Sequence, residues 1–86
     1  MRQLKSDFIG RGEVKGFEFT QLKKTDYGYI YAVNTGEEVR FEVFKHKENY
    51  KYNCVLYPKT KSFGIWAWTT GTFEHACEIL ESLKPM

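Results

Sequence analysis

The fold is decided by residues 27–45, which read YGYIYAVNTGEEVRFEVFK. Tyrosine recurs at every second position in the first part of this stretch, and in the last part apolar residues alternate with charged ones. Alternation of this kind, with β-branched and aromatic side chains, is typical of strands that face a core on one side. Gly36 lies between the two parts and suits the positive φ of a tight turn. The stretch therefore predicts an antiparallel hairpin of strands 27–33 and 38–45.

The same alternation continues outward from this hairpin in both directions. The alternating segments are separated by short polar stretches, and Pro58 ends one of them because it cannot donate to a sheet. Connections this short join antiparallel neighbours, since parallel strands need a long crossover. The additional predicted strands are 13–22, 50–57 and 62–69.

A helix is predicted after the last strand. Thr72 suits the N-cap because its hydroxyl can accept a hydrogen bond from an unpaired first-turn amide. Glutamates occupy the side that we expect to face water, and Pro85 cannot continue a helix, so we expect the end near Lys84. The apolar side, at helical spacing, consists of Phe73, Ala76, Cys77, Leu80 and Leu83.

These elements predict one α+β domain: a five-stranded antiparallel meander sheet with one C-terminal helix packed on one face, in the order β-β-β-β-β-α. The sequence leaves open whether the sheet curls toward a partly closed barrel. Residues 12–86 form the predicted domain, and residues 1–11 form an N-terminal arm whose order is also left open. The residues expected beneath the helix are Phe17, Phe19, Ile30, Val39, Phe41, Val43, Phe63, Ile65 and Ala67.

Length and composition narrow the class of protein. Eighty-six residues with a net charge of +2 leave room for one small domain, and 42% hydrophobic residues favour folding over disorder. Two cysteines, Cys54 and Cys77, are too few for a disulfide-stapled secreted scaffold. We find no signal-peptide pattern and no apolar run long enough to span a membrane. The sequence thus predicts a cytoplasmic protein with no membrane partner.

The second face of the predicted sheet is rich in aromatic rings that one helix cannot cover. A monomer seldom leaves so large an apolar patch without a use. Three explanations compete: the sheet curls and buries the rings, a second copy covers them, or they form a platform for a ligand. The rings are Tyr27, Tyr29, Tyr31, Phe44, Trp66 and Trp68.

Basic residues cluster near this face. Between residues 45 and 61, Glu48 is the one acidic residue among five lysines. Aromatic rings beside lysines are typical of sites for single-stranded nucleic acid, in which bases stack on rings and lysines follow the phosphates. Solvated hairpin tips are the alternative interpretation. The lysines are Lys45, Lys47, Lys51, Lys59 and Lys61.

The residues that could carry catalysis or bind a metal show no recognised pattern. Cys54, Cys77, His46 and His75 lack the close pairing of zinc ligands, and no nucleophile is paired with a base by a known motif. We therefore expect no enzyme, no metal and no cofactor. The first hypothesis is a small binding module for single-stranded nucleic acid. The alternative is a protein-interaction or homodimeric assembly subunit that uses the aromatic face as its interface.

Overall fold

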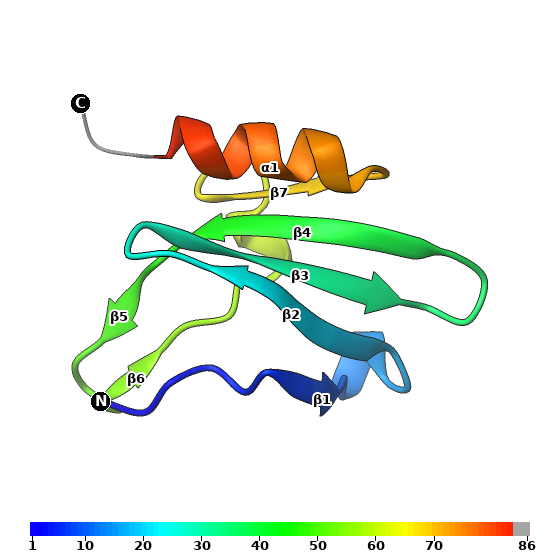
Figure 1. The fold of residues 1–86 in the computed structure, drawn as a ribbon. Coiled ribbons are helices and arrows are strands. Elements are labelled where there is room, and N and C mark those ends of the chain that lie inside the picture. The colour runs from blue at the N-terminus through cyan, green and yellow to red at the C-terminus, as the bar shows by residue number, and fades with distance from the viewer. Residues whose placement is uncertain (84–86) are drawn as a thin grey trace.

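The computed structural model describes residues 1–83 and places an antiparallel sheet between a helix on one side and irregular chain on the other (Figure 1). Within these residues the five-stranded sheet consists, in spatial order, of β1 (Asp7–Ile9), β2 (Glu18–Lys24), β3 (Gly28–Asn34), β4 (Val39–Lys45) and β7 (Ala67–Thr70). A separate hairpin pairs β5 (Glu48–Asn49) with β6 (Cys54–Val55). The helices are the 3₁₀ turns η1 (Gly12–Val14) and η2 (Thr60–Ser62), and α1 (Phe73–Ser82).

The α+β class, the antiparallel five-stranded sheet and the C-terminal helix are confirmed. The sheet is open, since β1 and β7 lie at its two edges. The central hairpin forms as predicted, with Tyr29 opposite Phe44 and Ile30 opposite Val43. Gly36 has a φ of 92° in its turn, as expected.

The other strands have different bounds from those predicted. The edge strand β1 comes from the segment expected to be an arm, and it pairs with β2 through Phe8 and Phe19. No residue of 50–57 lies in the main sheet, and only Cys54 and Val55 in that stretch form a strand, as part of the separate β5–β6 hairpin. β2 and β7 begin later in the sequence than predicted, because a glycine at positive φ interrupts the extended chain before each of them. Gly16 (86°) precedes β2 and Gly64 (89°) precedes β7.

One face of the sheet packs against α1. Ile30 and Val43 are fully buried against Ala76 and Leu80 of the helix. Thr72 caps the helix as predicted, because its hydroxyl oxygen accepts a hydrogen bond from the His75 amide at 3.2 Å. The helix ends at Ser82, and the predicted end near Lys84 lies outside the described residues.

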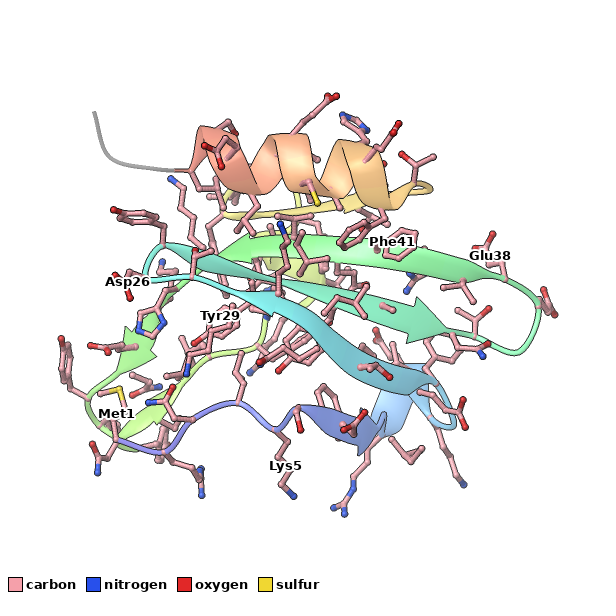
Figure 2. All side chains as sticks on the ribbon, in the orientation of Figure 1. Met1, Lys5, Asp26, Tyr29, Glu38 and Phe41 are labelled. Atoms are coloured by element: carbon pink, nitrogen blue, oxygen red, sulfur yellow. The ribbon has the colours of Figure 1, made fainter. Side chains whose placement is uncertain are left out.

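The opposite face is covered by the chain itself. Tyr29, Tyr31 and Phe44 are at most 1% exposed, and they lie beneath the N-terminal segment and the chain before β7. The Tyr31 hydroxyl donates to the Lys5 carbonyl at 2.6 Å, which holds the N-terminal segment over the sheet. Figure 2 shows Phe41 on the helix side and Tyr29 on this other side. The covering side chains are Leu4, Phe8, Val14, Phe17, Val55, Tyr57, Phe63 and Trp66.

The set of residues expected under the helix is therefore wrong in part. Ile30, Phe41 and Val43 do pack there. Val39 and Ile65 are instead 51% and 71% exposed. The remaining residues belong to the opposite cluster, because Phe19 pairs with Val33 and Ala67 pairs with Phe44 on that face. The residues assigned to the wrong face are Phe17, Phe19, Phe63 and Ala67.

Gly28 lies where the sheet packs closely against α1. A Cβ there would collide with the Phe44 carbonyl oxygen and press on methyl groups of Leu80 and Leu83. We predict that Gly28→Ala lowers the free energy of unfolding by about 1–3 kcal/mol, because it overpacks a filled core. Urea denaturation measures the change.

Gly71→Ala is the matched control. Gly71 is exposed, and a Cβ there would meet no atom within 4 Å. This variant should unfold within about 0.5 kcal/mol of the parent protein. Equal stability of the two variants would contradict the tight packing at Gly28.

Candidate functional site

A groove of about 1520 Å³ lies on the face of the sheet that α1 does not cover. Its floor is formed by side chains of β2, β4 and β7, namely Phe19, Arg40, Glu42 and Thr69. One wall is the chain from Phe8 to Val14, which includes η1, and the other is the segment from Tyr57 to Phe63, which includes η2. The groove thus lies between the two segments that cover the second face.

Aromatic rings line one end of the groove. Phe8 and Phe19 stack with ring centroids 4.6 Å apart and planes nearly parallel at 5°. Tyr57 meets both rings edge-on, with centroids at 5.5 and 5.4 Å. Edge-to-face and stacked pairs are both favourable arrangements of rings. The cluster holds the two walls together across the floor.

A buried carboxylate lies at the floor. Glu42 is 5% exposed, and its Oε1 accepts a hydrogen bond of 2.6 Å from the Tyr57 hydroxyl. Burial and then the neighbouring Glu42 charge raise the pKa of Tyr57 far above its ordinary value. The phenol therefore stays protonated at physiological pH and keeps donating to the carboxylate.

Arg40 lies beside Glu42 and balances its charge. The Arg40 Nε is 3.5 Å from Glu42 Oε2, and the guanidinium carbon is 5.6 Å from the centroid of the Phe17 ring. Among residues 1–83 this buried Nε finds no hydrogen-bond partner, although the side chain as a whole is 32% exposed. The pair places a donor and an acceptor side by side on the floor.

The rim of the groove is basic. Lys5, Arg11, Lys59 and Lys61 line it and are exposed, and Glu13 is the one acidic side chain among the exposed lining residues in the described part of the chain. Because Arg40 and Glu42 balance each other on the floor, the excess positive charge belongs to the rim. Such a rim attracts anions, and this attraction weakens as salt rises.

The aromatic residues predicted to bind a ligand do not form one open platform. Tyr29, Tyr31 and Phe44 lie in the core, so neither a ligand nor a second copy can reach them without removal of the covering segments. Of the three explanations that the sequence leaves open, burial within one chain is the one that holds for these three rings. The pleat does place them together, as the alternation indicates, but they are covered by the N-terminal segment and by parts of the predicted strands 50–57 and 62–69 that do not join the five-stranded sheet.

The remaining predicted aromatics lie apart from one another. Trp66 packs edge-on against Phe44 on the second face, with centroids 6.3 Å apart. Trp68 pairs with Val43, so it lies on the helix face and not beside Trp66. Tyr27 is 38% exposed in the turn before β3. The two tryptophans therefore cannot stack neighbouring bases on one surface.

The predicted lysines divide into two groups. Lys59 and Lys61 line the groove. Lys45, Lys47 and Lys51 do not: Lys47 Nζ lies 5.2 Å from the centroid of the Trp66 ring, and Lys51 Nζ lies 5.4 Å from that of Tyr52. The basic stretch thus contributes to the groove only at its C-terminal end.

Most of the residues that line the groove are not among the site residues predicted from the sequence. The alternation in β4 does place Arg40 and Glu42 on the side opposite Phe41, so a polar pair on the second face could have been found from the sequence. Phe8 and Arg11 could not, because they reach the site through the pairing of β1 with β2. The groove residues absent from the prediction include Lys5, Phe8, Arg11, Phe19, Arg40, Glu42 and Tyr57.

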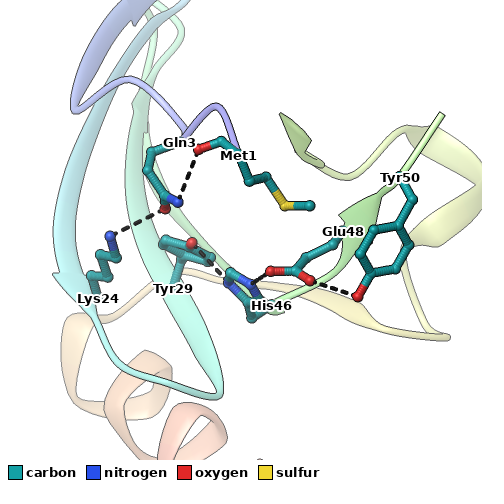
Figure 3. Close-up of polar contacts among 7 residues, drawn as sticks. All are labelled: Met1, Gln3, Lys24, Tyr29, His46, Glu48 and Tyr50. Atoms are coloured by element: carbon teal, nitrogen blue, oxygen red, sulfur yellow. Dashed lines mark hydrogen bonds and ion pairs between the residues drawn. The ribbon is translucent and has the colours of Figure 1, made fainter. Parts of the chain in front are cut away.

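A second polar network ties the β5–β6 hairpin to the sheet (Figure 3). The Tyr29 hydroxyl is 3.0 Å from His46 Nδ1, and His46 Nε2 is 3.0 Å from Glu48 Oε2. Tyr50 donates to Glu48 Oε1 at 2.9 Å. Burial, with the charge of Glu48, raises the pKa of Tyr29, so its hydroxyl is a poor nucleophile. The network orients the hairpin.

The described residues, 1–83, contain neither a candidate metal site nor a helix that could span a membrane. Within residues 1–83, Cys54 and Cys77 are free thiols, and no group of three or more His, Cys, Asp or Glu side chains could hold a metal ion. In the part of the chain that the structure describes, no helix has both the length and the apolar character needed to cross a membrane.

Comparison with known proteins finds no protein-family model, no curated protein and no solved structure that matches this chain.

The hydrogen bond from Tyr57 to Glu42 should contribute measurably to stability. Tyr57→Phe keeps the ring contacts but removes a donor from a buried carboxylate, so we predict a loss of about 1–3 kcal/mol in the free energy of unfolding. Urea denaturation at neutral pH measures it. Tyr50→Phe is the control, because Tyr50 is 81% exposed and its bond to Glu48 lies at the surface. Equal losses would contradict a special role for the buried bond.

The hairpin network predicts a pH effect at Glu48. Its hydrogen bond with His46, followed by that from Tyr50, lowers the pKa of Glu48 below its ordinary value of 4.5. A depressed folded-state pKa stabilises the fold above the unfolded value, and this contribution is lost as pH falls through the folded one. His46→Ala should raise the pKa of Glu48 toward 4.5 in a carboxyl-carbon NMR titration. An unchanged pKa would contradict the network.

Proposed function

We propose that this protein is a small, non-enzymatic binding module whose ligand is single-stranded nucleic acid, held in the groove between η1 and the Tyr57–Phe63 segment. The observation that carries the proposal is the coincidence, in one groove, of aromatic walls and a basic rim. Neither feature alone would specify the ligand.

The charge of the rim suits a phosphate backbone. Lys5 and Arg11 approach from the N-terminal segment, and Lys59 and Lys61 approach from the opposite wall. Cations on both sides of a groove can follow the phosphates of a strand that runs between them. A neutral or cationic ligand would gain nothing from this arrangement.

The aromatic rings favour unpaired bases over a duplex. Phe8, Tyr57 and Phe63 line the groove and are partly exposed, so each offers some ring surface to a ligand. Bases stack on such rings for about 1–3 kcal/mol each, but only when they are free of their own stack. The bases of a duplex are not available in this way.

The size of the groove favours a chain over a single small molecule. Pockets for small ligands usually enclose about 300–1,000 Å³, and this groove is larger, at about 1520 Å³. Several nucleotide units would fill it better than one compact metabolite. The alternative function, a homodimer joined through the aromatic face, has less support because Tyr29, Tyr31 and Phe44 are buried within one chain.

The proposal predicts salt-dependent binding of a fluorescent single-stranded oligonucleotide, measured by anisotropy. The double variant Lys59→Gln, Lys61→Gln should bind more weakly. Its dependence of log K on log salt should also be flatter, by about 0.7 for each phosphate that the protein no longer neutralises. Absence of saturable binding at low salt would end the proposal.

Lys45→Gln, Lys51→Gln is the matched control. It removes the same charge from exposed positions that do not line the groove. Its salt dependence should stay close to that of the parent protein. Equal weakening by both double variants would indicate attraction to the overall charge, and the groove would then not be the site.

A further inference from the structure

The floor of the groove differs in chemistry from its rim. Arg40 and Glu42 stand two positions apart on β4 and face the same side of the sheet. Their 3.5 Å ion pair makes the floor close to neutral, while the rim carries the excess of positive charge. Phosphates are therefore best placed at the rim, and the floor suits a neutral polar group. A nucleotide would enter with its base inward.

The floor also has hydrogen-bonding capacity that the described residues do not use. The buried Arg40 Nε has no hydrogen-bond partner in residues 1–83. The Glu42 carboxylate accepts a hydrogen bond from Tyr57, and its two oxygens together offer about four acceptor sites. Buried polar groups are nearly always satisfied, so an exception in a groove calls for an explanation. A bound ligand would fill the remaining acceptor sites of Glu42 and would meet the exposed part of the Arg40 side chain, which is 32% exposed although its Nε is covered.

We infer that this floor recognises the edge of a guanine base, an inference that rests on the proposed function. A carboxylate accepts, so it needs base N–H groups beside it, and a guanidinium donates, so it needs a base acceptor. Guanine offers adjacent N1–H and N2–H donors next to the O6 acceptor. Glu42 would accept from the two donors, and Arg40 would donate to O6.

The other bases match this floor less well. Thymine and uracil carry one N–H between two carbonyl acceptors, one of which would face the carboxylate. Adenine and cytosine each offer a single amino group beside a ring nitrogen, and so fill one acceptor site where guanine fills two. Because Glu42 is 5% exposed, an unfilled or repelled contact there is costly. The floor should therefore distinguish guanine from the other bases, whereas stacking on the rings and contacts with phosphates should not.

The test uses the unaltered protein and three thymidine oligonucleotides that differ in their central base. The centre is guanine in the first, inosine in the second, which lacks the N2 amino group, and thymine in the third. The guanine strand should bind about fivefold more tightly than the inosine strand, as expected for one hydrogen bond, and more tightly still than the thymine strand. Equal affinities would overturn the inference and leave the proposed function standing.

A protein variant separates the floor from the rim. Glu42→Gln keeps the shape of the side chain and replaces an acceptor by a donor, so the preference for guanine over inosine should disappear while the salt dependence stays unchanged. The double variant Lys59→Gln, Lys61→Gln should keep the preference for guanine over inosine but show a flatter salt dependence. Retained discrimination in a folded Glu42→Gln protein would overturn the inference. If that variant does not fold, the inosine comparison decides alone.

Discussion

Tyr57 connects the core of the second face to the groove above it. Its ring contacts Tyr31 and Phe44 of the sheet and Phe8 and Phe19 of the groove, while its hydroxyl donates to the buried Glu42 carboxylate. Without this hydrogen bond a charged group on β4 would lie in the core with too few partners, which is costly. The contacts of this one residue thus fix the wall of the groove and satisfy part of its floor.

The sheet consequently has two different covers. On one face a regular amphipathic helix packs on aliphatic side chains. On the other face the N-terminal segment and the chain before β7 pack on rings, and they leave the groove between them. Irregular segments carry binding sites more readily than regular ones, because they can place side chains independently of a repeating pattern. The rigid sheet beneath holds Arg40 and Glu42 in place.

The central hairpin and α1 could be predicted because their signals are local. Alternation over 27–45, the cap at Thr72 and the spacing of Ala76 and Leu80 need no knowledge of the rest of the chain. The cover of the second face could not be predicted, because it depends on long-range pairing: Phe8 reaches Phe19 through an edge strand, and Tyr57 reaches Glu42 from a loop. Of the predicted basic aromatic surface, Tyr29, Tyr31 and Phe44 consequently lie in the core, Lys59 and Lys61 line the groove, and the other residues lie outside the groove.

An amide-resolved NMR titration with a single-stranded oligonucleotide tests most directly whether the groove is the binding site. If it is, the shift changes will saturate and cluster in residues 8–14, 57–63 and the facing part of β4, and α1 will show none. Changes centred on α1 or on the β5–β6 hairpin, or no saturable change at low salt, would contradict it.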